Sequence, residues 1–280
     1  MPHAIVIQCI PREPLLAAAL HGAQLQAAFL DLLRSINPQL ATELHDGNVL
    51  RNYAVSLLQP RWWDSRDSGL SQVRELKLRV ACLDDRIYPV LAQWASTSLK
   101  SDLAIRLGQA HCEVARILAS NASGEAWAGQ ASFGELAERA PDQDMVIRME
   151  FATPTTFGQG DREEAMPLPR HVFGALLRRW NVACPRKLQI DACSSDEFLR
   201  RVEDNVVLAH PFEFRSAIAD LGGQLKLTGF VGHATYRIRR KPDSAFVRFV
   251  NLLADAAFFT GLGKKTSRGC GSVRRRPAKD

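Results

Sequence analysis

The order in which strand-like and helix-like hydrophobic patterns follow one another is the strongest constraint on the fold of this chain. In the first half, the β-branched run HAIVIQCI precedes apolar residues at helical spacing from Leu25 to Ile36, and then a short helical segment, PQLATEL. Two strand-like segments (NYAVSLL and SQVRELKLRVACL), a helical segment (DDRIYPVLAQWAST) and a last strand-like segment (LAIRLGQAHCEVARILA) complete this half. The order β-α-β-β-α-β is that of a ferredoxin-like unit.

The second half follows a similar plan with a larger first helical region. A strand in DMVIRMEFATPTTF precedes helices in PLPRHVFGALLRRWN and, capped by Ser194 or Ser195, in SDEFLRRVEDN. Strands around VVLAHPFEF, QLKLTGFV and ATYRIRR lead to a helix over 243–259, with Asp243 or Ser244 as N-cap and Gly261 just past its end, and then to a short strand. The two halves share no convincing sequence repeat, so the duplication is predicted from topology alone.

These patterns predict an α+β protein of two tandem ferredoxin-like (RRM-like, βαββαβ) domains. A chain of 280 residues with 46% hydrophobic composition is long enough to bury two cores. We expect an N-terminal domain over 1–125 and a C-terminal domain over 140–280. The linker is expected within 120–143, which is rich in small and polar residues.

A glycine-rich basic stretch, GLGKKTSRGCGSV, lies near the end of the chain at 261–273. The P-loop pattern would need glycine at Phe258 and Ser or Thr at Lys265, and the dinucleotide pattern would need glycine at Thr266. Both patterns also require a strand before the loop and a helix after it, whereas here the predicted order is reversed. Two interpretations stay open: a loop whose backbone N–H groups and basic side chains lie against a phosphate chain, or a flexible loop without a ligand.

Charge and cysteine usage exclude several classes of protein. The net charge is +6, and seven of the last seventeen residues are Lys or Arg, which favours a polyanion, nucleic acid above all, as a partner. The six cysteines have no C-x-x-C spacing, so neither a zinc site nor a disulfide framework is indicated. The sequence has no signal-peptide pattern and no apolar run long enough to span a membrane, and we expect a soluble, cytoplasmic protein.

The search for catalytic residues leads to histidine. The seven histidines form no H-E-x-x-H motif, and no G-x-S-x-G motif is present. In NPQLATELHDGNVLRNYAVSL, His45 ends a short helix and Arg51 opens the next strand. A histidine at a helix C-terminus also has a purely structural explanation, because His⁺ is favoured there by the helix dipole.

Several blocks, in order along nearly the whole chain, resemble the CRISPR-associated endoribonucleases of the RAMP superfamily that process precursor CRISPR RNA. LHGAQLQAAFLDLLRSINPQLATELHDG is similar to the family's first helix and following turn, in which an NPxLAxxLH segment carries the histidine implicated in catalysis. MEFATPTTF, LPRHVFGALLRRWN and LTGFVGHATYRI resemble further family blocks. GLGKKTSRGCGSV resembles the family's C-terminal glycine-rich loop, which binds RNA.

The resemblance implies two ferredoxin-like domains, no metal, no cofactor, and cleavage by attack of the ribose 2′-OH on the adjacent phosphate. The products are a 2′,3′-cyclic phosphate and a 5′-OH. His45 would then serve in acid–base catalysis, since imidazole ordinarily titrates near pH 6.5, and Arg51 would stabilise the phosphorane charge. The implied RNA-binding residues are Gly261, Gly263, Lys264, Lys265, Thr266, Ser267, Arg268, Gly269 and Gly271.

One position departs from the family pattern. Some members have a catalytic tyrosine on the first helix, where this chain has Leu30, so another side chain such as His21 or Tyr53 could fill the gap. The departure favours a second hypothesis, a non-catalytic RNA-binding RAMP subunit of a CRISPR effector complex. A mononucleotide-binding metabolic enzyme is disfavoured because both phosphate motifs fail.

The expected partners are a precursor CRISPR RNA repeat and CRISPR effector subunits, with a homodimer left open and no membrane. Four arginines on the predicted helices of the second half could face an RNA stem, although paired arginines on helices are more often solvated. The four are Arg178, Arg179, Arg200 and Arg201. His171 has no matched family position and is expected to be structural.

Overall fold

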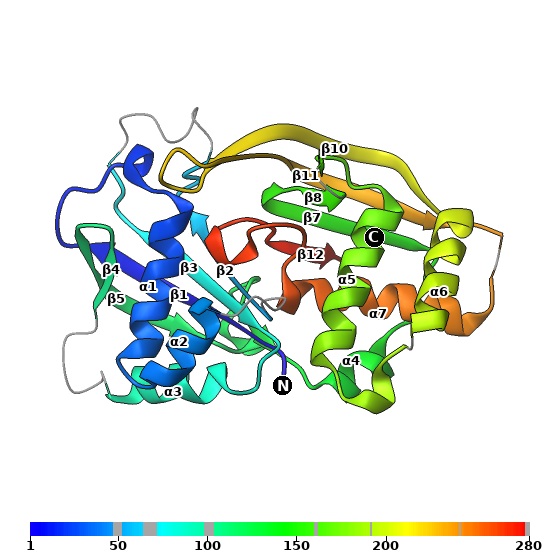
Figure 1. Cartoon of the computed structure of the whole chain (residues 1–280), viewed down its shortest axis with the longest axis horizontal. Coiled ribbons are helices and arrows are strands. Elements are labelled where there is room, and N and C mark those ends of the chain that lie inside the picture. The colour runs from blue at the N-terminus through cyan, green and yellow to red at the C-terminus, as the bar shows by residue number, and fades with distance from the viewer. Residues whose placement is uncertain are drawn as a thin grey trace.

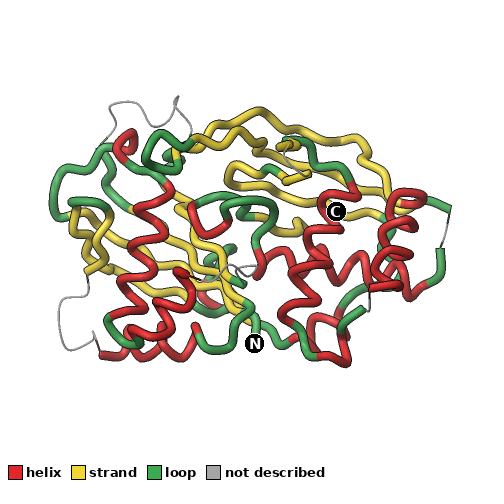
Figure 2. The backbone as a smooth tube through the Cα atoms, in the orientation of Figure 1, coloured by secondary structure: helices red, strands yellow, loops and turns green. Residues whose placement is uncertain are grey.

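A computed structural model describes residues 1–46, 52–63, 72–97, 104–159, 162–190, 192–240 and 242–277. Within these ranges the chain forms two α+β halves that lie side by side, each with helices packed on an antiparallel sheet (Figure 1). The backbone tube shows the same two layers of helix and strand in each half (Figure 2). None of the described helices combines the length and hydropathy needed to span a bilayer.

The first sheet has the strand order β2-β3-β1-β5-β4. Its half contains β1 (His3–Pro11), α1 (Gly22–Arg34), α2 (Pro38–Asp46), β2 (Tyr53–Gln59), β3 (Leu76–Cys82), α3 (Ile87–Thr97), β4 (Ala104–Leu107) and β5 (Ala110–Leu118). Strand β4 is an added edge strand. Without it, β1, β2, β3 and β5 are the first to fourth strands along the chain, and they lie in the sheet in the order second, third, first, fourth, with antiparallel neighbours throughout. This is the ferredoxin-like arrangement that the sequence predicts.

The second sheet, β10-β11-β7-β12, has the same order of second, third, first and fourth strand. Its half contains β7 (Val146–Thr155), β8 (Phe157–Gln159), β9 (Arg162–Glu164), α5 (Pro169–Ala183), α6 (Ala192–Asn205), β10 (Val206–Asp220), β11 (Lys226–Ile238), α7 (Ser244–Thr260) and β12 (Val273–Arg276). The prediction of two tandem ferredoxin-like units is therefore confirmed, although the halves show no sequence repeat.

Helix α7 forms where the sequence predicts it. The carboxylate of Asp243 accepts a hydrogen bond of 2.9 Å from the Phe246 amide, which satisfies one free donor of the first turn. Gly261 follows the last helical residue with φ of +63°, a backbone conformation that favours glycine. The helix is buried over most of its length, and it leads directly into the glycine-rich stretch.

A row of alanines lets α7 pack against the first sheet as well as the second. Ala4, Ala54 and Ala81 lie side by side on β1, β2 and β3, because Ala81 is in register with both of the others. All three side chains belong to the second hydrophobic core, together with the apolar residues of α7. Small side chains at this face allow the helix to approach closely, so the two halves share one packed boundary.

A buried arginine also joins the halves. Arg79 on β3 is 0% exposed, and its guanidinium donates hydrogen bonds to the carbonyls of Trp127 (3.0 Å) and Phe258 (2.5 Å). The same guanidinium lies over the rings of both residues. Burial, and secondarily the charge of Arg274, lowers the pKa of Arg79 to about 9, so it remains a cation at neutral pH.

The structure differs from the sequence-based expectation over 120–143. This segment is not a linker: it contains β6 (Gly129–Gln130), which pairs with β1, and α4 (Phe133–Arg139). Trp127 within it is 9% exposed. Helix α4 is capped reciprocally, because the Ser132 hydroxyl accepts from the Glu135 amide while the Glu135 carboxylate accepts from the Ser132 amide.

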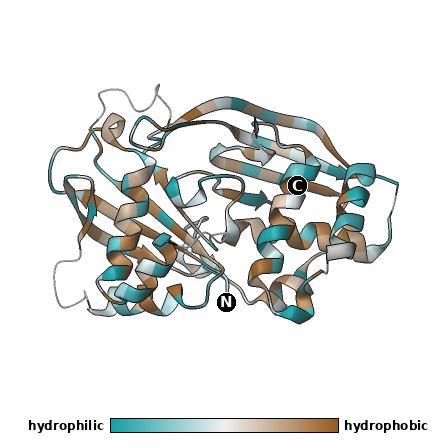
Figure 3. Cartoon of the chain, viewed as in Figure 1, coloured by the Kyte–Doolittle hydropathy of each residue, from teal (hydrophilic) through white to brown (hydrophobic). Residues whose placement is uncertain are grey.

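Strand boundaries differ as well. The run 103–119, expected as one strand, is a hairpin of β4 and β5 that turns at Gly108, where φ is +62°. The segments expected as separate strands between 224 and 240 form one strand, β11, which pairs along most of the fifteen-residue β10. Strand β10 carries both hydrophobic and hydrophilic residues (Figure 3). Helix α6 begins at Ala192, before the expected caps Ser194 and Ser195.

Candidate functional site

His45 lies in the last turn of α2, as the sequence predicts. The helix starts at Pro38, and the side chain of Asn37 accepts a hydrogen bond of 3.0 Å from the Leu40 amide in the first turn. Proline is favoured at such a position because its missing N–H has no partner there in any case. At the other end of the helix, the His45 side chain is 62% exposed, which leaves it accessible to a large ligand.

A carboxylate neighbours the His45 ring. Nδ1 of His45 lies 2.7 Å from Oδ1 of Asp46, and an ionised carboxylate can only accept a hydrogen bond. The neutral imidazole therefore carries its proton on Nδ1 and its lone pair on Nε2. This is the tautomer in which Nε2 can accept a proton from a substrate hydroxyl.

Arg51, the second expected catalytic residue, lies outside the described residues, as do all residues between α2 and Asn52. Leu30, which the sequence resemblance matches to the family tyrosine, is 3% exposed and belongs to the first hydrophobic core. Tyr53 is 0% exposed and packs against Phe29 with ring centroids 4.9 Å apart. Of the two side chains expected to replace the tyrosine, Tyr53 therefore has no access to solvent.

His21 is the other residue suggested for the tyrosine position. It is the N-cap of α1, and its backbone N–H donates to the Gln24 side chain at 3.1 Å. A Cβ added to Gly222 in the β10–β11 turn would lie 2.8 Å from Nδ1 of His21. His21 therefore sits where the first helix meets the turn of the second sheet.

The glycine-rich stretch folds into a compact loop between the two halves, drawn in red between β2 and α7 in Figure 1. Its four glycines all have positive φ: +63° at Gly261, +84° at Gly263, +90° at Gly269 and +73° at Gly271. Close packing also excludes a side chain at Gly271, because an added Cβ would lie 2.0 Å from the carbonyl oxygen of Leu262. The loop therefore has a defined, closely packed shape, unlike the flexible loop that was one of the two interpretations of the sequence.

The middle of the loop docks on the N-terminal half. A 3₁₀ turn, η5 (Thr266–Arg268), contacts α1 and β2. The Gly269 amide donates to the Val55 carbonyl at 2.9 Å, and the Arg268 guanidinium donates to the Gln26 side chain at 2.8 Å. The loop thus bridges the β2 side of the first half and α7 of the second.

Most of the loop's backbone amides bond to protein acceptors. The amides of Leu262, Lys264 and Gly271 donate to the carbonyls of Gly271, Thr156 and Pro154 at 2.8–3.0 Å. The amides of Arg268, Gly269 and Ser272 likewise have protein acceptors. In this structure the glycines serve the folding of the loop, and few of its amides are left to face a phosphate chain.

The three loop cations differ in exposure. Lys264 forms an ion pair of 3.0 Å with Glu163, and its side chain is 39% exposed. Lys265 is exposed and has a φ of +56°, whereas Thr266 and Ser267 are 3% and 4% exposed. Arg268 is half-buried. Lys265 is therefore the loop cation most open to an approaching polyanion.

Arg179 supports the loop from the second half, which sequence reasoning did not foresee. It is 6% exposed, and its guanidinium donates to the carbonyls of Thr260 (3.1 Å) and Gly263 (3.2 Å) and to the Thr266 hydroxyl (3.2 Å). Burial, with a smaller contribution from Arg178, lowers the pKa of Arg179 to about 10. Arg179 therefore holds the loop in place and does not face an RNA stem.

Within the described residues, no three His, Cys, Asp or Glu side chains are grouped closely enough to hold a metal ion. The described cysteines (Cys9, Cys82, Cys112, Cys184 and Cys270) are all buried. Burial raises the pKa of the Cys270 thiol, within the loop, to about 12, so it is protonated at neutral pH and unsuited to nucleophilic attack.

Comparison with known proteins gives matches over both halves. The family model of the CRISPR Cas6 N-terminal domain matches residues 1–138, and that of the CRISPR-associated endoribonuclease Cas6 matches residues 149–273. CRISPR-associated endoribonucleases Cas6 from two strains of Mycobacterium tuberculosis are 30% identical over 131 residues, which is 47% of this chain and 39% of theirs. The matched stretch thus spans well under half the length of these relatives.

Solved structures extend the similarity to the whole fold. A structure described as a Cas6 product complex has 26% identity and a TM-score of 0.81, covering 99% of this chain and 100% of that chain. Thermus thermophilus Cas6 has 25% identity and a TM-score of 0.74, covering 99% of this chain and 98% of that chain. A Cas6 substrate mimic complex, at 22% identity and a TM-score of 0.72, shares the fold.

Proposed function

Because the chain belongs to the Cas6 family of CRISPR-associated endoribonucleases, we propose that it cleaves precursor CRISPR RNA within the repeats. The observation that carries this proposal is His45 itself, an exposed histidine at the end of α2 whose Nδ1 is paired with a carboxylate. The similarity to a Cas6 product complex over the whole chain supports RNA as the substrate.

The proposed reaction uses the RNA's own hydroxyl as nucleophile. The 2′-oxygen forms a bond to the adjacent phosphorus, the bond from phosphorus to the 5′-oxygen breaks, and the proton lost from the 2′-OH is balanced by one gained by the leaving oxygen. The products carry a 2′,3′-cyclic phosphate and a 5′-OH. Neither a metal nor a cofactor takes part in this proposed route.

His45 would move one of these two protons through Nε2, either from the 2′-OH or to the departing oxygen. Asp46 holds the ring in the required tautomer and stabilises the imidazolium after proton uptake. We assign stabilisation of the phosphorane to Arg51, on the strength of the family resemblance and the geometry of a guanidinium.

The glycine-rich loop would bind the RNA backbone. Its cations Lys264, Lys265 and Arg268 are the groups available for this, while the glycines, Thr266 and Ser267 contribute through the shape of the loop. Replacing the three cations by alanine should weaken RNA binding. It should also reduce the slope of log affinity against log salt concentration by up to about 2, because each lost phosphate contact contributes about 0.7 to that slope. An unchanged slope would limit the loop to a structural role.

The test of the catalytic assignment is His45→Ala, with His111→Ala as its control. His111 is also an exposed histidine beside a carboxylate, 3.4 Å from Glu13, but it lies on β5 and not on α2. Cleavage of repeat RNA by the His45 variant should fall by about 10²- to 10⁴-fold while RNA affinity is retained. Cleavage at the wild-type rate by His45→Ala, or an equal loss in the His111 variant, would contradict the assignment.

A non-catalytic RNA-binding subunit is the second candidate. It is favoured by Leu30, which places a buried aliphatic side chain where some relatives have a catalytic tyrosine. In that case the wild-type protein would bind repeat RNA tightly without cutting it, and His45→Ala would change nothing measurable.

A further inference from the structure

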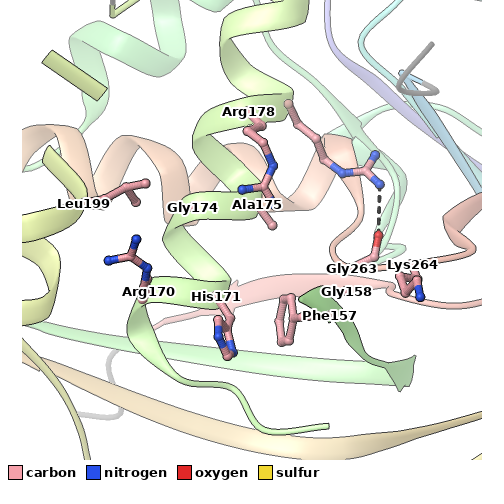
Figure 4. Close-up of a pocket in the computed structure, with 11 residues that line it drawn as sticks. Phe157, Gly158, Arg170, His171, Gly174, Ala175, Arg178, Leu199, Gly263 and Lys264 are labelled. Carbon is pink, nitrogen blue, oxygen red and sulfur yellow. Dashed lines mark hydrogen bonds between the residues drawn. The ribbon is translucent and has the colours of Figure 1, made fainter. Parts of the chain in front are cut away.

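A basic pocket of about 350 Å³ lies in the C-terminal half, where α5 and β8 meet the beginning of the glycine-rich loop (Figure 4). Its lining includes Phe157, Arg170, His171, Gly174, Arg178 and Lys264. All of these residues belong to the second half, whereas His45 belongs to α2 of the first. His45 is therefore not among the residues that line this pocket.

One stripe of α5 forms a wall of this pocket. Arg170, Gly174 and Arg178 follow one another at intervals of four residues, so they share one face of the helix. Figure 4 shows the two arginine side chains on either side of the gap at Gly174. The helix thus presents two guanidinium groups with a hollow between them.

Gly174 has no packing reason to be glycine. It lies in the middle of the fifteen-residue α5, where glycine is the poorest helix former apart from proline. A Cβ added there would lie 3.4 Å from the nearest atom, a methyl group of Leu199, and 3.7 Å from a guanidinium nitrogen of Arg178, which are ordinary contacts. Alanine would therefore fit the fold, and the effect of glycine is to keep the hollow open.

The charges of the pocket are only partly balanced. Arg170 is paired with Glu203 at 2.5 Å, and Lys264 with Glu163 at 3.0 Å, both through solvent-exposed ion pairs. Arg178, in contrast, forms no hydrogen bond or ion pair with the described residues, and partial loss of water lowers the pKa of its guanidinium. A bound anion would supply the missing counter-charge.

Two rings complete the lining. Phe157 and His171 lie with centroids 5.8 Å apart. Nδ1 of His171 is buried and has no hydrogen-bond partner among the described residues, which is costly unless a ligand or water satisfies it. His171 therefore offers a polar atom that the fold itself does not use.

We propose that this pocket binds a backbone phosphate of the RNA other than the phosphate at the cleaved bond, with Arg178 as its principal ligand. The planar guanidinium matches two phosphate oxygens, and Lys264 adds a second cation from the opposite wall. The glycine-rich loop begins at this pocket and continues to β2, so a strand held here would cross the loop toward the N-terminal half. The inference rests on the proposed function, because it takes RNA as the ligand.

The test is Arg178→Gln, with Arg200→Gln as a control of equal charge change. Arg200 lies on α6 outside the pocket and is 69% exposed beside Glu197. Binding is measured between about 50 and 200 mM salt, using repeat RNA with a 2′-deoxy nucleotide at the scissile position so that it is not consumed. Arg178→Gln should bind about tenfold more weakly, with a salt slope smaller by about 0.7, and the control should match wild type.

Gly174→Ala provides a second variant that cannot be dismissed as misfolded. The added methyl group should raise the thermal stability of the protein while narrowing the hollow, and so weaken RNA binding several-fold. If Arg178→Gln and Gly174→Ala both bind RNA as tightly as the wild-type protein, the proposal that the pocket binds an RNA phosphate is wrong.

Cleavage of the all-ribose RNA separates this inference from the proposed function. In cleavage assays, Arg178→Gln should raise the enzyme concentration that gives half-maximal cleavage by the same factor by which it weakens RNA binding. If the wild-type protein binds RNA without cutting it, and Arg178→Gln weakens that binding, the pocket stands and the endonuclease proposal fails. If the wild-type protein cuts RNA and Arg178→Gln binds RNA with wild-type affinity, the endonuclease proposal stands and the phosphate pocket fails. The affinity of the wild-type protein for inorganic phosphate and for a mononucleotide is measured as well. If either binds as tightly as RNA, and Arg178→Gln loses that binding to the same extent, RNA is not the ligand of the pocket.

Discussion

Replacing Arg79 by methionine removes the buried cation that joins the two halves. Methionine has a similar length and no donor, so the carbonyls of Trp127 and Phe258 lose their hydrogen-bond partner in a site that water does not reach. Each buried carbonyl left unsatisfied costs about 1–3 kcal/mol, and the lost contact with the two rings adds about 0.5–2 kcal/mol. Relief from burying a charge acts in the opposite direction and can offset about 1–4 kcal/mol.

The expected net loss is about 2–4 kcal/mol of unfolding free energy, because the two carbonyls remain buried whichever side chain faces them. At about 2–4 °C per kcal/mol for a protein of this size class, the melting temperature should fall by about 4–16 °C. Calorimetry and urea titration monitored by tryptophan fluorescence measure both quantities.

Arg86→Met is the matched control. Arg86 forms ion pairs of 2.8 Å with Glu43 and Asp84, but its side chain is 59% exposed, so its removal should cost no more than about 1 kcal/mol. If the two variants lose equal stability, or if Arg79→Met changes it by less than about 0.5 kcal/mol, burial is not what makes Arg79 important.

Three further predictions concern the loop, α7 and the histidine. Gly271→Ala should lower the free energy of unfolding, measured by urea titration, by more than about 3 kcal/mol, because its Cβ would lie 2.0 Å from a carbonyl oxygen. Gly223→Ala is the control: its φ is +61° but no atom lies near the added Cβ, so the loss should be about 1 kcal/mol. Asp243→Ala should cost about 1 kcal/mol at neutral pH. Hydrogen bonds from a backbone amide and an arginine lower the pKa of Asp243 below 3.8 in the folded state. Its contribution is therefore full above pH 3.8 and is lost as the pH falls through the folded pKa, and a stability difference that does not shrink as the solution is acidified would contradict this. Asp46→Asn should slow cleavage by less than the loss of His45 and leave RNA affinity unchanged, which single-turnover kinetics would measure.

Much of the fold is predictable because its elements are marked locally. Helix α7 has its apolar stripe, its Asp243 cap and Gly261 at its end within twenty residues of sequence, and the structure reproduces all three. The β-α-β-β-α-β order could be obtained twice from periodicity, and the common sheet order follows from that topology.

Features that depend on contacts between distant segments were not predictable in this way. The segment 120–143 was mistaken for a linker because its small residues outweighed one local signal, the Ser132–Glu135 capping box. The alanine row across β1, β2 and β3 is visible only once the strands are in register. Arg79 could not be recognised as buried, because its acceptors are backbone carbonyls far away in the sequence.

The candidate site also has parts that the sequence indicates and parts that only the structure shows. The family resemblance drew attention to His45 and the glycine-rich loop, and the structure adds Asp46 beside the first and Arg179 beneath the second. The glycines and basic residues of the loop left phosphate binding open as one interpretation, and the structure shows that tertiary packing uses most of the loop amides. Gly174 was overlooked because a glycine inside a helical pattern carries no signal until the space beside it is known.

The most direct test of the central claim is a single cleavage experiment with a synthetic CRISPR repeat RNA in excess EDTA. The RNA is compared with a matched substrate that carries a 2′-deoxy substitution at the suspected scissile nucleotide. The account predicts that only the all-ribose RNA is cut, leaving a 2′,3′-cyclic phosphate and a 5′-OH. Cleavage of both substrates, or loss of all cleavage in EDTA with recovery on adding Mg²⁺, would contradict 2′-OH attack assisted by His45.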